Sequence, residues 1–243
     1  FTSRITLSAL GEEDFGIYNI VGGIVVLFSF LNSALTTATQ RFLNYEIGKE
    51  NEKAVNQIFC MSMNIYIGLS IIIIVLSETI GLWFLNTQMN IPENRMQAAY
   101  WVYQFSILSF IINLIRVPYN ATIIAYEKMS FFAYLSMIEV MFKLISVYYL
   151  YITSSDKLII IAILYTIIPF LINIVYKKYC NTHFTTSQFH LFWNKILFKK
   201  LTSFSIWNFF GSLANIGATQ GINIILNIFW GVTVNAAAGI ANQ

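Results

Sequence analysis

The sequence predicts an all-α polytopic membrane protein, and two of its features carry this prediction. Hydrophobic residues form 57% of the chain and charged residues only 10%, with a mean hydropathy of +0.66, whereas a soluble domain has about 25% charged residues. The apolar residues also come in runs of about 20, which is the length needed to cross a hydrocarbon layer about 30 Å thick. Runs such as residues 71–76 do not alternate between apolar and polar residues, so helices are favoured over a membrane β-barrel.

The apolar runs divide the chain into a first lobe, a connector and the start of a second lobe. The first lobe, residues 1–176, is expected to hold six helices in a two-lobed helical bundle, with the first helix truncated. The connector at 177–203 is polar and basic, and the second lobe begins at 204. Because both ends fall inside helices, we expect the sequence to be a fragment. The predicted helices cover residues 1–10, 15–40, 54–76, 98–125, 131–151, 158–176 and 204–230, followed by the start of an eighth near residue 235.

The basic residues between the helices predict an orientation, because cytoplasmic loops carry an excess of Lys and Arg. The loops after the second, fourth and sixth helices are therefore predicted to be cytoplasmic. Only Arg95 and Lys157 fall on the other side, with the acidic segment 12–14. An interfacial aromatic belt is expected on that side from Tyr100, Trp101, Tyr103, Tyr148 and Tyr149. The basic residues of the predicted cytoplasmic loops are Arg41, Lys49, Lys53, Lys128, Lys177, Lys178, Lys195, Lys199 and Lys200.

Several classes of function are disfavoured by the sequence. A net charge of +3 is too small to indicate a nucleic-acid partner. The distant Cys60 and Cys180 indicate neither a disulfide framework nor a metal site. His183 and His190 lie in the connector without a carboxylate or cysteine at ligand spacing, so no metal or cofactor is predicted. A membrane-embedded glycan-modifying enzyme remains the least favoured alternative, because no catalytic acid, base or nucleophile arrangement is visible.

Polar side chains recur at three- and four-residue steps on several of the apolar helices, so each set shares one helix face. A water-filled cavity inside the bundle would explain these stripes. The alternative is that Ser, Thr and Asn hold neighbouring helices together. We expect Asn113 and Asn120 to line such a cavity. The stripes on the fourth and fifth helices comprise Ser106, Ser109, Asn113, Arg116 and Asn120, and Ser136, Glu139, Lys143 and Ser146.

Charged residues within the helices are the strongest candidates for a transport site, since a charge at membrane depth costs about 2.5–3.5 kcal/mol on insertion scales. Arg116 has no acidic residue one turn away. Glu139 and Lys143 are spaced for an ion pair, which is either structural or functional. Arg4 faces the cavity or reaches the membrane interface. These three cations outnumber the single carboxylate, so the predicted cavity is net positive and suits a pyrophosphate better than a cationic drug.

Three segments resemble motifs of bacterial polysaccharide and O-antigen flippases of the Wzx type. These are residues 10–18 (LGEEDFGIY), 39–43 (TQRFL) and 117–120 (VPYN). Such flippases belong to the MOP superfamily, which includes the MATE exporters, and the likeness is strongest to Bacteroidetes-like members. It covers essentially the whole chain, although its motifs are diffuse and specify fold better than substrate.

The resemblance implies a two-lobed transporter of the bacterial inner membrane that moves polyprenyl-pyrophosphate-linked oligosaccharide outward by alternating access. Its expected partners are this lipid-linked oligosaccharide, membrane lipids and a coupling H⁺ or Na⁺ ion. The resemblance also implies that Arg4 and Arg116 hold the pyrophosphate.

One segment departs from the flippase pattern. Residues 235–241 (NAAAGIA) are closer to the small-residue helix of MATE multidrug exporters, so an ion-coupled drug efflux antiporter is the main alternative. Against it, the first helix shows no acidic residue, where many such exporters keep an ion-coupling carboxylate.

Overall fold

The computed structural model describes residues 2–26, 29–87, 89, 91–153, 155–211 and 214, and within these ranges the side chains of residues 2–4, 20 and 22–34 are outside the description. All regular elements in these ranges are helical. The α-helices are α1 (Thr2–Leu10), α2 (Glu12–Val26), α3 (Ser29–Ile47), α4 (Glu52–Leu76), α5 (Leu82–Thr87), α6 (Met96–Ala125), α7 (Met129–Tyr149) and α8 (Lys157–His183), with a further helix at residues 195–211. Short turns occupy Ser77–Gly81 (π-helical), Glu93–Arg95 and Thr185–Ser187 (both 3₁₀).

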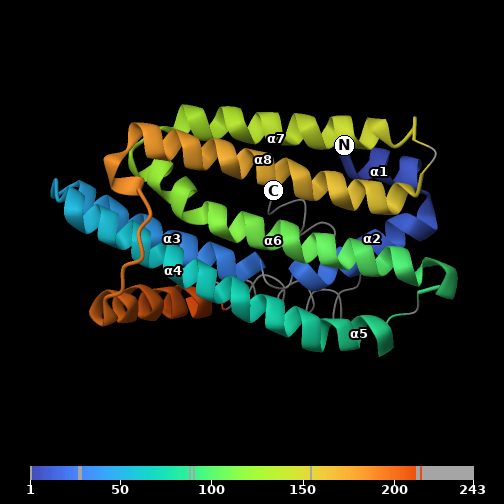
Figure 1. Ribbon diagram of the computed structural model, residues 1–243, viewed down its shortest axis with the longest axis horizontal. Coiled ribbons are helices and arrows are strands. Elements are labelled where there is room, and N and C mark those ends of the chain that lie inside the picture. Colours follow the sequence, from blue (N-terminus) through green and yellow to red (C-terminus); the bar gives the residue numbers. More distant parts are fainter. Residues whose placement is uncertain are drawn as a thin grey trace, which may run out of the picture.

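The helices run back and forth along the long axis of the bundle (Figure 1). The turns after α3 and α6 and the end of α8 lie at one end, which we call the basic end because it carries Lys49, Lys53, Lys128, Lys177 and Lys178. The α1–α2, α5–α6 and α7–α8 connections lie at the opposite end. The loops that the charge pattern assigned to one side therefore do share one end. Which end faces the cytoplasm stays a prediction.

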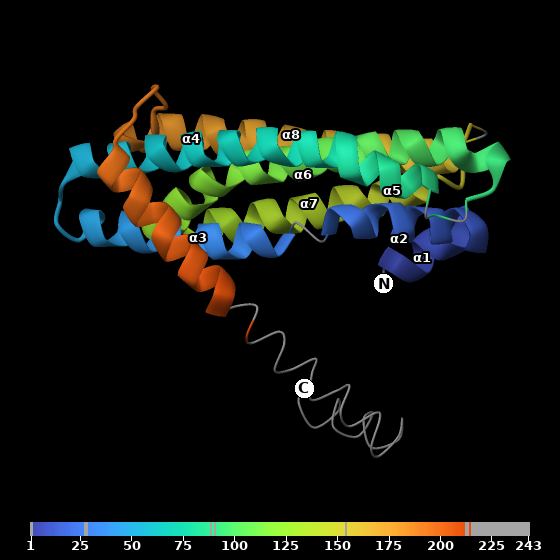
Figure 2. The same ribbon diagram turned by 90° about the horizontal axis from the view of Figure 1, so that it is seen from below.

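Helix α6 is the centre of the bundle and packs against α2, α3, α4, α7 and α8. In Figure 2 it lies between α4 and α8 on one side and α7, α3, α2 and α1 on the other. Two side-chain hydroxyls join α6 to α8. Ser109 donates a hydrogen bond to the Tyr165 carbonyl at 3.2 Å, and Thr166 donates one to the Phe105 carbonyl at 2.9 Å. For Ser109, this contact supports the view that some polar residues hold helices together.

Four described helical segments have the length and hydropathy needed to cross a membrane: Glu52–Thr87, Glu93–Ala125, Met129–Tyr149 and Lys157–His183. Large apolar side chains on their outer faces are exposed, among them Ile71 at 57% and Met137 at 63%. An apolar surface of this extent is unfavourable in water and is expected in contact with lipid. Length, hydropathy and surface composition thus all fit a multi-pass membrane protein.

The third predicted helix extends past its predicted end at residue 76, because α4 continues through the π-helical turn into α5. In this turn the Ser77 carbonyl accepts the backbone N–H of Leu82, at the i to i+5 spacing of a π-helix. The same carbonyl also accepts a hydrogen bond from the Tyr103 hydroxyl at 2.9 Å. A Cβ on Gly81 would lie 1.8 Å from the Tyr103 hydroxyl oxygen, so glycine is required there. Tyr103 is consequently fully buried, and its assignment to the interfacial belt is wrong. The other four aromatic residues of that belt are exposed.

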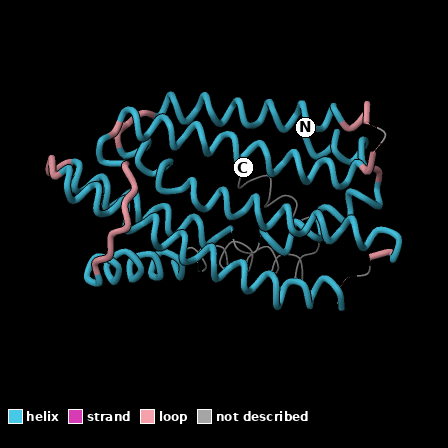
Figure 3. The backbone as a smooth tube through the Cα atoms, in the orientation of Figure 1, coloured by secondary structure: helices cyan, strands magenta, loops and turns pink. Residues whose placement is uncertain are grey.

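The non-helical part of the connector is shorter than predicted, because the helices on both sides extend into it. Helix α8 continues to His183, beyond its predicted end at residue 176, and the next helix begins at residue 195 rather than near 204. Between them lies a mostly extended segment, residues 184–194, which we call the connector strap; it is drawn as a loop in Figure 3 apart from its short 3₁₀ turn. The predicted seventh helix beyond residue 214 and the predicted eighth helix fall outside the described residues.

The connector strap lies along one face of α4, held by Asn56, Cys60 and Asn64 at four-residue steps. The two carboxamides donate to strap carbonyl groups at 2.6 to 3.0 Å. The Cys60 sulfur lies 3.4 Å from Nδ1 of His190 and accepts the backbone N–H of the same residue at 3.4 Å. An extended segment has no internal ladder to satisfy its backbone, so these three side chains explain why the strap follows α4.

Candidate functional site

Three of the charged residues predicted for the transport site meet between α6 and α7. Arg116 Nη1 donates to Glu139 Oε2 at 2.7 Å, and Lys143 Nζ donates to Glu139 Oε1 at 2.8 Å. The side chains are 20%, 13% and 35% exposed for Arg116, Glu139 and Lys143. We call this cluster the α6–α7 triad. Each oxygen of its single carboxylate is engaged by one cation.

The local sequence explains this placement. Glu139 lies midway along α7, and Lys143 is one turn further on, in the order that favours an ion pair. Arg116 reaches Glu139 from the neighbouring helix, and the sequence of α6 itself offers no acidic partner one turn away. Its guanidinium carbon also lies 5.6 Å from the centre of the Tyr176 ring on α8, within cation–π range. Arg116 is thus held by two helices at once.

The triad has two cations against one anion and carries a formal net charge of +1. Arginine offers five N–H donors and lysine three. Among the described residues, Arg116 and Lys143 each use one donor, both toward Glu139. The remaining N–H groups are chemically suited to oxygen acceptors with negative charge, above all phosphate oxygens.

The two predicted asparagines behave differently from each other. Asn113 donates to the Ser109 carbonyl at 2.9 Å, within its own helix. The side-chain oxygen of Asn120, one turn from Arg116, is buried and accepts no hydrogen bond within the described part of the chain. Buried acceptors are normally satisfied, so Asn120 is the stronger candidate for contact with a ligand or an ordered water.

The structure describes some, but not all, of the other residues that the sequence predicts for the site. Arg4 lies in α1, but its side chain is outside the described residues, so its direction stays a prediction. Ser136 and Ser146 donate to carbonyls of their own helix at 2.9 and 2.8 Å, and these hydroxyls therefore give no support to a polar cavity. Within the described ranges, no group of three or more His, Cys, Asp or Glu residues is placed to hold a metal ion.

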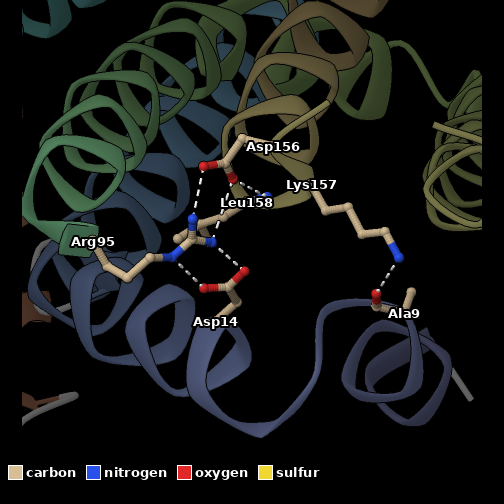
Figure 4. A network of polar contacts seen from close by, with 6 residues as sticks. All are labelled: Ala9, Asp14, Arg95, Asp156, Lys157 and Leu158. Atoms are coloured by element: carbon tan, nitrogen blue, oxygen red, sulfur yellow. Dashed lines mark hydrogen bonds and ion pairs between the residues drawn. The ribbon is translucent and has the colours of Figure 1, made fainter. Parts of the chain in front are cut away.

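A second charged cluster, which the sequence reasoning missed, closes the end opposite the basic end (Figure 4). Arg95 donates through Nε to Asp14 at 2.9 Å and through Nη1 to Asp156 at 2.8 Å, and it also forms an ion pair with Asp14 through Nη2. Lys157 donates to the Ala9 carbonyl at 3.2 Å. The available signal was that the two cations and the acidic residues fell on the same predicted side. These contacts tie the ends of α1, α2, α6 and α8 together.

The segments that carry the flippase resemblance have identifiable structural roles. In the first, Gly11 joins α1 to α2 with φ of +84°, a conformation that favours glycine, and Asp14 binds Arg95. In the second, the Arg41 guanidinium lies 4.3 Å from the centre of the Phe204 ring, which links α3 to the helix at residues 195–211. The third supplies Asn120. Much of the pattern is therefore explained by folding, without reference to a substrate.

No protein-family model, curated protein or solved structure matches the chain. The described residues alone therefore define the class of protein: they are all-helical, with four candidate membrane spans and an ionic cluster between two of these spans.

Proposed function

We infer that the chain is the first lobe and the start of the second lobe of a two-lobed, MATE-like transporter of the MOP superfamily, which flips polyprenyl-pyrophosphate-linked oligosaccharide to the outer leaflet by alternating access. The observation that carries this proposal is the α6–α7 triad, a net-positive cluster inside candidate membrane spans whose cations keep N–H donors that no other described residue engages. The sequence resemblance supplies the substrate class.

The depth of the triad within the candidate spans is an energetic argument that its charges serve a function or stabilise one another. Arg116 is followed by nine further residues of α6, which places it about 14 Å from the end of that helix at 1.5 Å per residue. Intramembrane charges are expensive and are usually paired or functional. Glu139 compensates one of the two cations, and the second remains for an anionic ligand.

Each residue has a distinct role in this proposal. Arg116 binds the pyrophosphate through its planar fork of donors, and Lys143 adds a second positive charge. Glu139 holds both cations in place when no substrate is bound, and the phosphate oxygens compete with it for them. Asn120 accepts a hydrogen bond from a bridging water or a hydroxyl of the substrate.

The drug-exporter alternative is less well supported by this geometry. A site for a cationic drug calls for a carboxylate with free acceptor capacity at membrane depth. In the described portion of the chain, both oxygens of Glu139 are already engaged by cations. An exporter would first have to displace Arg116 and Lys143.

The test compares cells that lack the gene for the full-length protein with cells that express it in wild-type or variant form. Without the protein, polyprenyl-pyrophosphate oligosaccharide should accumulate and surface glycan should disappear. Arg116→Ala should reduce glycan export at least about tenfold at equal protein level, because a charge-assisted contact of about 1.5–3 kcal/mol is lost. Lys128→Ala, an exposed cation in the α6–α7 turn outside the triad, serves as the matched control and should export normally.

Two outcomes would count against this proposal at different levels. Unchanged lipid intermediates and intact surface glycan in the cells without the protein would overturn the flippase function. Greater uptake of a cationic dye by those cells would then favour the drug exporter. Full export by Arg116→Ala would instead overturn only the assignment of the site.

A further inference from the structure

A groove of about 540 Å³ lies on the side of the bundle where α4 and α8 flank α6 (Figure 2). Its walls are mainly apolar, with Met63 and Ile67 from α4, Ile115 from α6, and Phe170 and Ile174 from α8. All three helices belong to candidate membrane spans. If these helices span the membrane, the groove faces lipid, and its apolar walls are suited to acyl chains.

One wall of the groove carries a polar stripe. Asn173, Lys177 and Asn181 line the groove from α8 at four-residue steps, so they share one helix face. None of the three side chains makes a hydrogen bond or ion pair with another described residue. The side-chain oxygen of Asn173 is buried and has no hydrogen-bond partner among the residues that the structure describes. Lys177 and Asn181 are exposed, whereas Asn173 presents a buried acceptor that normally has a partner. A ligand with both an apolar part and a polar part fits this arrangement.

The position of this stripe matches the boundary between acyl chains and headgroups. The long apolar run of α8 ends at Tyr176, and Lys177 follows it directly. Asn173 lies one turn deeper, about 6 Å along the helix axis, and Asn181 lies one turn closer to the basic end. Basic residues gathered at one membrane surface attract anionic lipids, with about 1 kcal/mol for each Lys or Arg near the surface.

We propose that this groove binds one anionic glycerophospholipid of the leaflet at the basic end. Its phosphate accepts a charge-assisted hydrogen bond from Lys177, and its acyl chains lie against Ile67 and Phe170. Asn173 donates through its side-chain nitrogen to an ester carbonyl oxygen of the lipid, and its buried oxygen accepts from a bridging water. Asn181 contacts the headgroup hydroxyls. This site is separate from the α6–α7 triad and does not rest on the proposed transport function.

The chain supplies its own matched controls. Lys178 has the same charge, is also exposed and is the next residue on α8, but it does not line the groove. A general attraction of the basic end for anionic lipid would involve both lysines equally. In the same way, Ile67 lines the groove at 37% exposure, whereas Ile71, one turn further along α4, is 57% exposed and lies outside it.

The test uses the purified full-length protein in detergent, stripped of lipid and titrated with phosphatidylglycerol, with bound lipids counted by native mass spectrometry. We expect one lipid to be retained more tightly than the rest, and phosphatidylethanolamine to bind this site more weakly. Lys177→Ala should weaken the tight site about tenfold, as expected for the loss of a charge-assisted contact, while Lys178→Ala should not. Ile67→Trp, which fills the groove, should also abolish the tight site, while Ile71→Trp should not.

Several results would overturn the proposal. Equal weakening by Lys177→Ala and Lys178→Ala would show a diffuse surface effect instead of a site. Tight retention of the lipid by Ile67→Trp would show that the acyl chains lie elsewhere. Retention of a polyprenyl phosphate with no phospholipid would identify a different occupant. Should Lys177→Ala fail to fold, as judged by its helix content, Lys177→Gln together with the Ile67 and Ile71 pair decides the question.

Discussion

Glu139 accepts hydrogen bonds from Arg116 on α6 and from Lys143 on its own helix, so one carboxylate stabilises two cations. The consequences of removing each partner are unequal. Without Arg116, Glu139 keeps Lys143. Without Glu139, two positive charges face each other at membrane depth with no described counter-ion. A buried ion left without its partner is a strongly destabilising defect.

We therefore expect Glu139→Ala to destabilise the protein by about 3–5 kcal/mol and Arg116→Ala by about 1–3 kcal/mol. Lys143 is about one third exposed, so its replacement by Ala should cost less, about 0–1 kcal/mol after screening by solvent. The measurement is the free energy of unfolding in mixed micelles titrated with denaturing detergent. In a double-mutant cycle, the combined Glu139 and Arg116 variant should be more stable than the sum predicts by about 1–3 kcal/mol. Strict additivity would contradict the direct pairing.

At the scale of single elements, the connector strap shows how a loop is fixed by the helix beneath it. Asn56, Cys60 and Asn64 form a polar stripe on α4 that fits the strap and buries the Cys60 thiol completely. Local opening of a connecting segment requires less free energy than global unfolding, and a reagent reaches the buried Cys60 only when the strap opens. The exposure of Cys60 therefore reports directly on the closure of the strap.

Asn64→Leu removes the donor to the Phe192 carbonyl, a hydrogen bond of 2.6 Å, and should loosen the strap. We expect alkylation of Cys60 by a small maleimide to accelerate about fivefold, which corresponds to the loss of about 1 kcal/mol of closing free energy. Cys180 is buried in α8 and serves as the internal control in the same peptide map. Thr182→Ala removes only a hydrogen bond within α8 and should leave both rates unchanged. Faster labelling of both cysteines by Asn64→Leu would indicate general unfolding instead.

The contacts of the strap also illustrate which features could not be predicted from the sequence. Apolar runs and charged loops predicted the helices and their alternation, because hydrophobicity and charge act locally along the chain. The contact between Cys60 and His190 joins residues far apart in sequence, and it depends on how the strap after α8 is placed against α4. The same holds for the pairing of Arg116 with Glu139. The four-residue spacing of Asn56, Cys60 and Asn64 places them on one face of α4, but spacing alone does not identify a partner.

For the whole molecule, the distribution of charge between the two ends is the property that decides orientation. The basic end carries cations without equal numbers of nearby acids, whereas at the opposite end Arg95 is neutralised by Asp14 and Asp156. Topology follows the number of Lys and Arg residues near the membrane and not the net charge. The prediction that the basic end is cytoplasmic therefore depends on its excess of lysines over Arg95 and Lys157 at the opposite end.

Single cysteines at the two ends test this orientation in the full-length protein. Lys128 in the α6–α7 turn and Ser155 in the α7–α8 connection are both exposed, and the native Cys60 and Cys180 are buried, so background labelling should be low. A membrane-impermeant maleimide applied to intact spheroplasts should label Ser155→Cys and spare Lys128→Cys. Inside-out vesicles should give the reverse. Labelling of both positions from the same side would contradict the assignment of α7 as a membrane span. A fully inverted pattern would keep the spans and reverse the orientation, which would place the phospholipid groove in the outer leaflet.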